Sequence, residues 1–443
     1  MKSRLLAFGC LLVALLMCLL SCGDDAQESG SGQLGGAPVG GGDTAKDVDP
    51  FVMVLTPDSV GILNGAIYFD SGNEHIFYFA NENGALQGNT AIGKSSDGCL
   101  ELDGVIVPPG STCIEVHGDT GLEYVVEIPK GSLLDDDELF IFGVLSDVHY
   151  NRYIRDEIDD AEVSFDLALD YFEKIGVQFV GIAGDITSNG KVSAFEKYND
   201  AITERPFEVY TITGNHDVTA IDSGIWYQQI TANLKDVELA PNEIDFVYKI
   251  DEMGGDVFVF LNQVRWEYNT EDATILDREQ LEWLEQVLKE NREHTVYLFF
   301  HTFLCGPDGE LHTGVGNIMN PGGYTYPLPY TYGNEDEVQF RRLMKEYKNV
   351  VYFSGHSHWM FEMDVYGEET NYSDFGGEYC HMVHVPSVTE PRFIGDEDVD
   401  RTGKNGESSQ GWVAYDYGET LILVPVDFIT GVIYTERMVR IEQ

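Results

Sequence analysis

Five short apolar runs, each followed at once by polar side chains, constrain the fold of this chain more than any other feature. The runs are rich in β-branched and aromatic residues, as buried strands of an α/β sheet are. Ligands of such sheets bind at the carboxyl ends of the strands, so one geometric rule would bring five distant segments together. The runs cover residues 139–145, 178–183, 208–213, 295–300 and 350–353.

The side chains that follow these runs are of the kinds that bind metal ions. They comprise three carboxylates, five imidazoles and one carboxamide. Oxygen and nitrogen donors in this mixture suit a pair of borderline-hard divalent cations. In chain order the residues are Asp147, His149, Asp185, Asn215, His216, Asp217, His301, His356 and His358.

The charge of the chain excludes some partners. It has 76 acidic and 26 basic residues among 443, a formal net charge of −50. A protein this acidic repels polyanions, so we expect no nucleic-acid partner. A small phosphate ester can still bind where metal ions supply local positive charge. Otherwise the acidity is typical of a soluble protein in a salty or extracellular setting.

The N-terminus predicts export. Lys2 and Arg4 precede an apolar stretch over 5–20, which is short for a membrane span and fits a signal peptide over 1–21. The stretch ends at Cys22 and resembles the lipobox of bacterial lipoproteins, in which this cysteine carries the lipid. We therefore expect a membrane partner through a lipid anchor at Cys22, in the bacterial cell envelope, at the outer membrane and facing either the periplasm or the outside. Ordinary cleavage after Ser21 is the alternative.

Cysteine usage agrees with an exported protein, because exported compartments permit disulfides. Cys99 and Cys113 flank a turn-rich stretch and form a plausible pair, but the pairing among these two, Cys305 and Cys380 stays open. Cys305 lies near His301 without a Cys-x-x-Cys pattern, so we interpret it as a non-ligand.

Three segments follow the signal peptide. Residues 22–47 are rich in glycine and predict a flexible tether. Residues 48–134 hold short alternating runs with no helical period, typical of a small all-β domain such as an immunoglobulin-like sandwich. Residues 135–443 alternate strands and helices. Within them, the insert 305–334 is long enough to be a lid or binding loop.

Helix and strand patterns in the third segment are regular. Apolar residues over 161–175 recur at spacings of three and four and predict a helix. Asp277 is a candidate N-cap for a second helix over 278–290. Four strand-like runs near the C-terminus are expected to complete a second sheet of the same domain. They cover 412–415, 420–424, 431–434 and 438–441.

Taken in order over residues 139–360, the polar motifs resemble those of the calcineurin-like metallophosphoesterases. The most specific blocks are Gly-Asn-His-Asp at 214–217 and Gly-His-Ser-His at 355–358. The resemblance implies an α/β fold, an α/β/β/α sandwich of two mixed sheets, preceded here by the small all-β domain. It also implies a metal-dependent phosphoric ester hydrolase in which a metal-bridging hydroxide attacks phosphorus.

The same resemblance implies roles for single residues. Asp185 would bridge two divalent ions, of Mn, Fe or Zn. Asp147, His149 and His358 would complete the shell of one ion, and Asn215, His301 and His356 that of the other. His216 would protonate the leaving group, and Asp217 would hold the ring of His216 by a hydrogen bond.

Departures from the family pattern indicate which subgroup of the family this chain resembles. Purple acid phosphatases have a tyrosine where this chain has Ser188 and lack a histidine at the place of His149, so an iron(III)–tyrosinate centre is not expected. The segment 276–284 looks like the helix before the lone histidine in cyclic-nucleotide and glycerophosphodiester phosphodiesterase-like members. Arg152 and Arg155 are candidates to grip an anionic substrate, although they could equally balance neighbouring acidic residues on the surface.

Three functions remain open at the level of sequence. The leading hypothesis is two-metal hydrolysis of a phosphate ester, either a monoester or a diester, by an exported and membrane-anchored enzyme. A non-catalytic surface binding lipoprotein could retain the same fold. A one-metal hydrolase of another bond type, such as an amidase, is the third.

Overall fold

The structure, a computed structural model, describes most of the chain beyond residue 51. The described ranges are 52–55, 61–69, 72–81, 84–85, 91–102, 104–128, 139–150, 160–203, 205–218, 238–239, 248–253, 255–263, 276, 278–304, 335–361, 371–394, 401–403 and 407–443. Several predictions lie outside the described residues: the signal peptide 1–21, Cys22, the tether 22–47, Arg152, Arg155, Asp277, Cys305 and the insert 305–334.

The first three apolar runs form one half of a mixed six-stranded sheet. Its strands are β11 (Phe140–Leu145), β12 (Phe179–Ile182), β13 (Glu208–Thr211), β23 (Gln410–Asp416), β24 (Thr420–Asp427) and β25 (Val439–Glu442). The order is β13-β12-β11-β23-β24-β25. β11, β12 and β13 pair in parallel, while β23, β24 and β25 continue the sheet from β11 in antiparallel register.

The other two runs lie in a mixed seven-stranded sheet. Its strands are β14 (Glu238–Leu239), β15 (Tyr248–Met253), β16 (Asp256–Phe260), β17 (Val296–Phe299), β18 (Val350–Ser354), β19 (Tyr372–Ser373) and β20 (His381–His384). The order is β14-β15-β16-β17-β18-β20-β19, and the four strands β16, β17, β18 and β20 are parallel. Their carboxyl ends therefore meet at one edge of the sheet.

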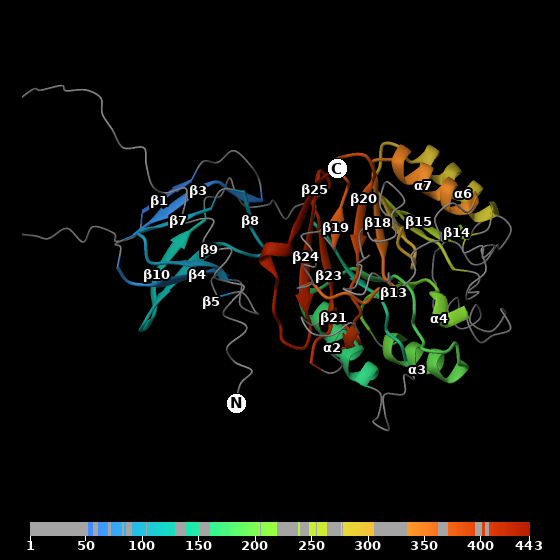
Figure 1. Cartoon of the computed structure of the whole chain (residues 1–443), viewed down its shortest axis with the longest axis horizontal. Coiled ribbons are helices and arrows are strands. Elements are labelled where there is room, and N and C mark those ends of the chain that lie inside the picture. Colours follow the sequence, from blue (N-terminus) through green and yellow to red (C-terminus); the bar gives the residue numbers. More distant parts are fainter. Residues whose placement is uncertain are drawn as a thin grey trace, which may run out of the picture. The chain divides into compact units, whose positions relative to one another are not determined.

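Helices cover the outer face of each sheet. The long ones are α2 (Asp160–Ile175), α3 (Val192–Thr203), α6 (Arg278–Glu290) and α7 (Glu335–Glu346); α4 (Asn215–Val218) and the 3-10 helix η3 (Thr435–Arg437) are short. α2 and α3 share a core with the first sheet, and α6 and α7 share one with the second (Figure 1). The predicted apolar stripes are buried: Phe165 and Phe172 in α2, and Leu284 and Leu288 in α6, are fully inaccessible to solvent.

The two sheets face each other across a third core that is rich in aromatic rings. Phe142 and Phe179 stack with their ring centroids 5.0 Å apart, and Phe258 meets Phe179 edge to face at 4.8 Å. Both sheets are buried on both faces, which explains why their strands are continuously apolar. The domain is the predicted α/β/β/α sandwich of two mixed sheets.

A β-rich region precedes the sandwich, also as predicted. Its strands are β1 (Val52–Leu55), β2 (Ile62–Leu63), β3 (Gly65–Tyr68), β4 (His75–Asn81), β5 (Gly84–Ala85), β6 (Ala91–Ser95), β7 (Cys99–Glu101), β8 (Val105–Ile106), β9 (Cys113–Gly118) and β10 (Gly121–Glu127). They pair antiparallel around their own core. Cys99 and Cys113 are not bonded to each other.

Within the described part of the chain, no helix has the length and apolarity needed to cross a membrane.

The C-terminal strands correct one sequence-based prediction. β23, β24 and β25 were expected to complete a second sheet, but they extend the sheet of β11. Residues 431–434 form no strand; Ile433 makes only an isolated bridge to Val426. The two remaining strands, β21 (Arg392–Ile394) and β22 (Arg401–Gly403), form a separate antiparallel pair. A strand pattern predicts pairing, but the choice of partner depends on long-range contacts that the pattern does not contain.

A buried pair of carboxyl groups lies where β16 begins and β23 ends. Asp256 is 8% exposed and Asp416 is 2% exposed. Asp416 accepts a hydrogen bond of 2.6 Å from the hydroxyl of Tyr297, and Asp256 accepts one of 2.9 Å from the backbone N–H of Thr295. Burial and the charge of Asp416 raise the pKa of Asp256 to about 7. The folded protein therefore holds a proton here that the unfolded chain releases near pH 4.

This pair predicts that the free energy of unfolding falls as pH rises from about 4 to 7, because the folded state binds the extra proton throughout that window. We expect Asp256→Asn, whose amide replaces the carboxyl proton, to stabilise the protein at pH 8 by about 1–2 kcal/mol after allowance for solvent screening. Thermal unfolding of both proteins at pH 5 and pH 8 measures this. A difference between them that does not change with pH would contradict it.

Candidate metal centre

The loops after five strands bring the candidate ligands together. Asp147 follows β11, Asp185 follows β12, Asn215 follows β13, His301 follows β17, and the Gly-His-Ser-His block follows β18. Within each sheet, the strands that precede the motifs are parallel to one another, so their carboxyl ends lie at the same edge of that sheet. The ligand candidates are buried, with exposed fractions from 0% for Asp147 to 7% for His356.

A first cluster contains Asp147, His149, Asp185 and His358. One ligand atom of each lies within 4.8 Å of those of the others. Nε2 of His358 is 2.9 Å from Oδ1 of Asp147 and 3.0 Å from Nε2 of His149. Nε2 of His149 is 3.7 Å from Oδ2 of Asp185. Two carboxylates and two imidazoles thus face a common point.

A second cluster contains Asp185, His301 and His356, again with ligand atoms within 4.8 Å of one another. Nε2 of His301 is 3.2 Å from Oδ2 of Asp185 and 3.2 Å from Oδ1 of Asn215. Asp185 therefore belongs to both clusters. It is the carboxylate in a position to be shared by two ions.

The backbone at the clusters is strained. Of the six non-glycine residues with positive φ in the described ranges, five belong to the two clusters. They are Asp147, His149, Asp185, His356 and His358, with φ between 52° and 74°. Such conformations cost of order 1–3 kcal/mol each and persist where the surroundings enforce them, as they do at functional sites. Hydrogen bonds between loops hold them, including Asp147 N–H to the carbonyl of Gly184 at 3.0 Å.

The ring orientation of His301 is determined by its outer nitrogen. Nδ1 of His301 donates to the carbonyl of Ala183 at 2.7 Å. Nε2 then faces Asp185 and Asn215. A metal-binding histidine is typically held in this way, with its other ring nitrogen bonded to a carbonyl or carboxylate.

Burial and neighbouring charges set the protonation of the clusters. Burial alone would raise the pKa of Asp147, but His358, His149 and His301 outweigh it and hold that pKa well below its usual value. Burial lowers the pKa of His149 and of His356 to about 3. Burial would also lower that of His301, but Asp185 and Asp147 raise it to about 9. The negative potential is strong enough to hold a proton on a buried imidazole, and it favours a bound cation in the same way.

The donor set fits divalent metal ions. Oδ1 of Asp147 and Oδ2 of Asp185 are buried and form no hydrogen bond among the described residues. A buried carboxylate oxygen without a hydrogen bond lowers the stability of the fold unless a cation binds it. Neutral imidazoles and ionised carboxylates are the protonation states in which these groups bind metal.

The family model of the calcineurin-like phosphoesterases matches residues 140–360. This segment belongs to that family. No curated protein matches the chain. The metallophosphoesterase fold and the buried cluster of histidine and aspartate are thus found together, in agreement with hydrolysis of a phosphoester by two metal ions.

Solved structures resemble this chain at a distance. A dimetal phosphatase from Danio rerio is 15% identical, with a TM-score of 0.47 over 68% of this chain and 98% of that one. A purple acid phosphatase from yellow lupin seeds is 13% identical, with a TM-score of 0.46 over 89% of this chain and 75% of that one. A protein from Thermus thermophilus is 10% identical, with a TM-score of 0.31 over 60% and 99%. These likenesses are too remote to support an argument about activity.

His216 and Asp217, from the Gly-Asn-His-Asp block of the phosphoesterase domain, lie beside the clusters but do not form the predicted pair. Nδ1 of His216 donates to the carbonyl of Ser188 at 3.0 Å, and its ring meets that of His149 edge to face at 4.8 Å. Asp217 instead accepts hydrogen bonds from the backbone N–H groups of residues 186, 187 and 214 and from the hydroxyl of Thr187. The prediction that Asp217 orients the His216 ring is wrong. Asp217 holds two phosphoesterase loops together, those of 185–187 and 214–217.

Two glycines of the motifs, Gly214 and Gly355, are needed for space. A Cβ on Gly355 would lie 1.9 Å from Oγ of Ser146 and 2.5 Å from Oδ2 of Asp147. A Cβ on Gly214 would lie 2.2 Å from Oδ1 of Asp185. Any side chain at either position would displace a carboxylate of the clusters.

We therefore expect Gly355→Ala to destabilise the protein by about 1–3 kcal/mol, the usual cost of overpacking, and to remove bound metal. Ser146 cannot simply move, because its hydroxyl donates to Asp147 at 2.7 Å. Metal analysis and thermal unfolding measure both effects. Gly255→Ala is the control: its Cβ would meet nothing within 4 Å, although its φ of 98° imposes strain. Equal metal loss in the two variants would contradict the steric explanation.

The sequence motifs did not predict that a set of residues after β20 contributes to the site. Ser387, Thr389 and Glu390 are buried and lie against the first and last motif loops. They are beyond the segment that the family model matches. The signal available in the sequence was a sixth strand-like run over residues 382–385, apolar except for His384, which leads through Pro386 to Ser387.

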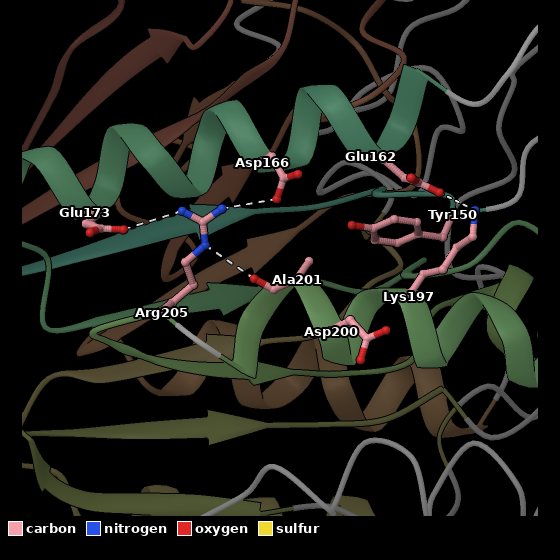
Figure 2. A pocket seen from close by; sticks show the side chains of 8 residues that line it. All are labelled: Tyr150, Glu162, Asp166, Glu173, Lys197, Asp200, Ala201 and Arg205. Carbon is pink, nitrogen blue, oxygen red and sulfur yellow. Dashed lines mark hydrogen bonds and ion pairs between the residues drawn. The ribbon is translucent and has the colours of Figure 1, made fainter.

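A groove of about 570 Å³ lies between α2 and α3, and none of the residues that line it is a candidate metal ligand (Figure 2). Its basic residues are already engaged: Arg205 pairs with Asp166 at 3.1 Å and Glu173 at 3.5 Å, and Lys197 pairs with Glu162. Salt bridges within the groove balance its cations, so it offers little positive potential to a phosphate group.

Proposed function

We propose that this protein is a two-metal hydrolase of phosphate esters. The observation that carries the proposal is the position of Asp185, which is buried and shared between two clusters of oxygen and nitrogen donors. A pair of ions clamped by one carboxylate suits the in-line displacement of a phosphoryl group. Membership of the calcineurin-like family supports the same reaction class.

Seven residues would hold the ions. Asp185 would bridge them, Asp147, His149 and His358 would bind one, and Asn215, His301 and His356 the other. When bound, a pair of divalent ions lowers the pKa of a water molecule and offsets charge on the phosphate. Mn²⁺, Fe²⁺ and Zn²⁺ all suit these donors, and availability would decide among them.

His216 would act on the leaving group. Its Nδ1 donates to the carbonyl of Ser188 and so fixes the ring, and Nε2 would be the atom that serves the substrate. The ring lies at the rim of the first cluster, against His149, and is half-buried. A protonated imidazole in this position would donate from Nε2 to the oxygen of the departing alcohol.

Metal analysis and a substrate panel test the proposal. We expect purified protein loaded with Mn²⁺ to hold two ions per chain and to hydrolyse an aryl phosphodiester or monoester, and a chelator to abolish the activity. Two bound ions without turnover of any phosphate ester would favour the non-catalytic binding protein. Cleavage of peptide bonds but not phosphate esters, with one ion bound, would favour the amidase.

Within this reaction class we propose a phosphodiesterase close to the cyclic-nucleotide and glycerophosphodiester enzymes. The support is the resemblance of segment 276–284 and the pair Arg152 and Arg155, which follow His149 and could bind an anionic group of the substrate. Alanine at both arginines is expected to raise KM for a diester that carries a second anionic group beside the phosphodiester, and to leave KM for bis-p-nitrophenyl phosphate, which carries none, unchanged. An equal change for both substrates would argue against specific binding.

We also propose that the protein is exported and anchored in the cell envelope by a lipid on Cys22. The support is the basic and apolar N-terminal segment that ends at this cysteine. Incorporation of labelled fatty acid by the wild type but not by Cys22→Ala, together with release of the variant from membranes, is the expected result. A wild-type protein without label would exclude the anchor.

A further inference from the structure

A short segment after β20 connects two of the three loops that supply the first cluster, those after β11 and β18. The backbone N–H of Val388 donates to the carbonyl of Ser146 at 3.0 Å, and the hydroxyl of Ser387 donates to the carbonyl of Asp147 at 2.8 Å. On the other side, the N–H of Arg392 donates to the carbonyl of His358 at 2.7 Å. Residues 387–392 therefore brace Asp147 and His358 from outside the clusters.

Glu390 lies in the middle of this segment and faces the outer nitrogen of His358. Its Oε2 is 3.4 Å from Nδ1 of His358. Nε2 of the same ring points inward, 2.9 Å from Asp147. Nδ1 is buried and has no hydrogen-bond partner among the described residues. A carboxylate, an imidazole and the first cluster thus follow one another in a line.

Two further contacts hold Glu390 in place. Its backbone N–H donates to the hydroxyl of Ser387 at 2.8 Å. Its Oε2 accepts from Nε of Arg392 at 3.1 Å and also contacts Nη2 of that guanidinium. Arg392 thereby offsets the charge of a carboxylate that is only 8% exposed.

We infer that Glu390 is a positioning residue for His358: its carboxylate is placed to accept a hydrogen bond from Nδ1–H when an ion is bound, which would fix the tautomer with a lone pair on Nε2 and strengthen binding of an ion at the first cluster. The inference rests on the proposed two-metal function. Carboxylates behind metal-binding histidines act in this way, and their loss typically weakens metal binding 10- to 100-fold. The second cluster has a different outer partner, the carbonyl of Ala183 behind His301. Glu390 therefore affects one ion and not the other.

The chain contains a matched pair that separates this role from a purely structural one. Glu337 and Arg341 on α7 form another buried ion pair, 2.6 Å from Nη2 to Oε1, among the residues that cover the second sheet. Glu337 is fully inaccessible to solvent. Removing its carboxylate also takes the Glu337 charge away from a buried arginine, but on a helix that contains none of the candidate metal ligands.

Metal titration of the full protein, freed of metal by a chelator and then given Mn²⁺, tests the inference by calorimetry and elemental analysis. We expect Glu390→Ala to weaken one of two binding events 10- to 100-fold and to leave the other unchanged. Glu390→Gln, whose amide oxygen can still accept from Nδ1, is expected to recover most of the loss. Glu337→Ala is expected to lower the melting temperature without changing either affinity.

Two wild-type affinities in Glu390→Ala would overturn the inference, as would equal losses in Glu390→Ala and Glu337→Ala. If Glu390→Ala does not fold, Glu390→Met keeps the volume without an acceptor and is expected to give the same selective loss; unchanged affinities in that variant would equally overturn it. A wild type that binds fewer than two ions would instead overturn the proposed function itself.

Discussion

Asp185→Asn is expected to lower kcat/KM for an aryl phosphate ester by about a thousandfold, or about 4 kcal/mol, and to reduce bound metal from two ions to one or none. The reason is geometric, because Asp185 is the one residue that the two clusters share. An amide of the same shape keeps the fold but loses the charge that two cations need between them. Steady-state kinetics with Mn²⁺ and elemental analysis of the same samples measure the two effects.

Asp256→Asn is the matched control for this experiment. It makes the same replacement of a carboxyl group by an amide at another buried aspartate of the same domain, at the beginning of β16 rather than after a strand end. We expect this variant to keep two ions and wild-type kinetics. If Asp185→Asn kept full activity, or if both variants lost it equally, Asp185 would not be the bridging ligand.

The second large effect is expected for His216→Ala, which should lower kcat by about 10²–10³-fold while both ions stay bound. The ring is held by the carbonyl of Ser188 rather than by the carboxylates of the clusters, so its removal takes away no ligand. Its proposed task is to protonate the leaving alcohol. Elemental analysis with kinetics separates that task from metal binding.

Substrates with different leaving groups distinguish general-acid catalysis by His216 from other causes of a lower rate. An alkyl leaving group needs a proton in the transition state more than p-nitrophenolate does, so the loss in His216→Ala should be larger for an alkyl ester. His149→Ala is the comparison variant, because it should lose metal and reduce both rates by the same factor. A loss in His216→Ala that is independent of the leaving group would rule out general-acid catalysis by this ring.

Much of the fold could be predicted from the sequence, because the patterns that indicate strands and helices lie within short segments of the chain. Each strand of the two sheets that precedes a motif is a continuous apolar run, since both of its faces are buried. The helix over 278–290 was predicted with the bounds that α6 has. The positions of candidate ligands follow from the rule that binding groups collect at the carboxyl ends of strands.

Other features depended on contacts between distant segments. The pairing of β23 with β11 brings together residues more than 260 positions apart, such as Val144 and Trp412. No periodicity distinguishes that partner from a strand of the second sheet. The same holds for Asp217: the resemblance implied that it holds the ring of His216, but its oxygens accept hydrogen bonds from the N–H groups of residues 186, 187 and 214 instead.

By itself, then, the amino-acid sequence determined which side chains are available to bind metal and that an α/β sheet would present them. Tertiary structure alone decided that Gly214 and Gly355 are required for space and that Glu390 stands behind His358. The physical reason is the range of the forces. Hydrophobic periodicity is a property of neighbouring residues in the chain, so it is visible in the sequence. Hydrogen bonds and close packing depend on which distant groups the completed fold brings within about 3 Å of one another.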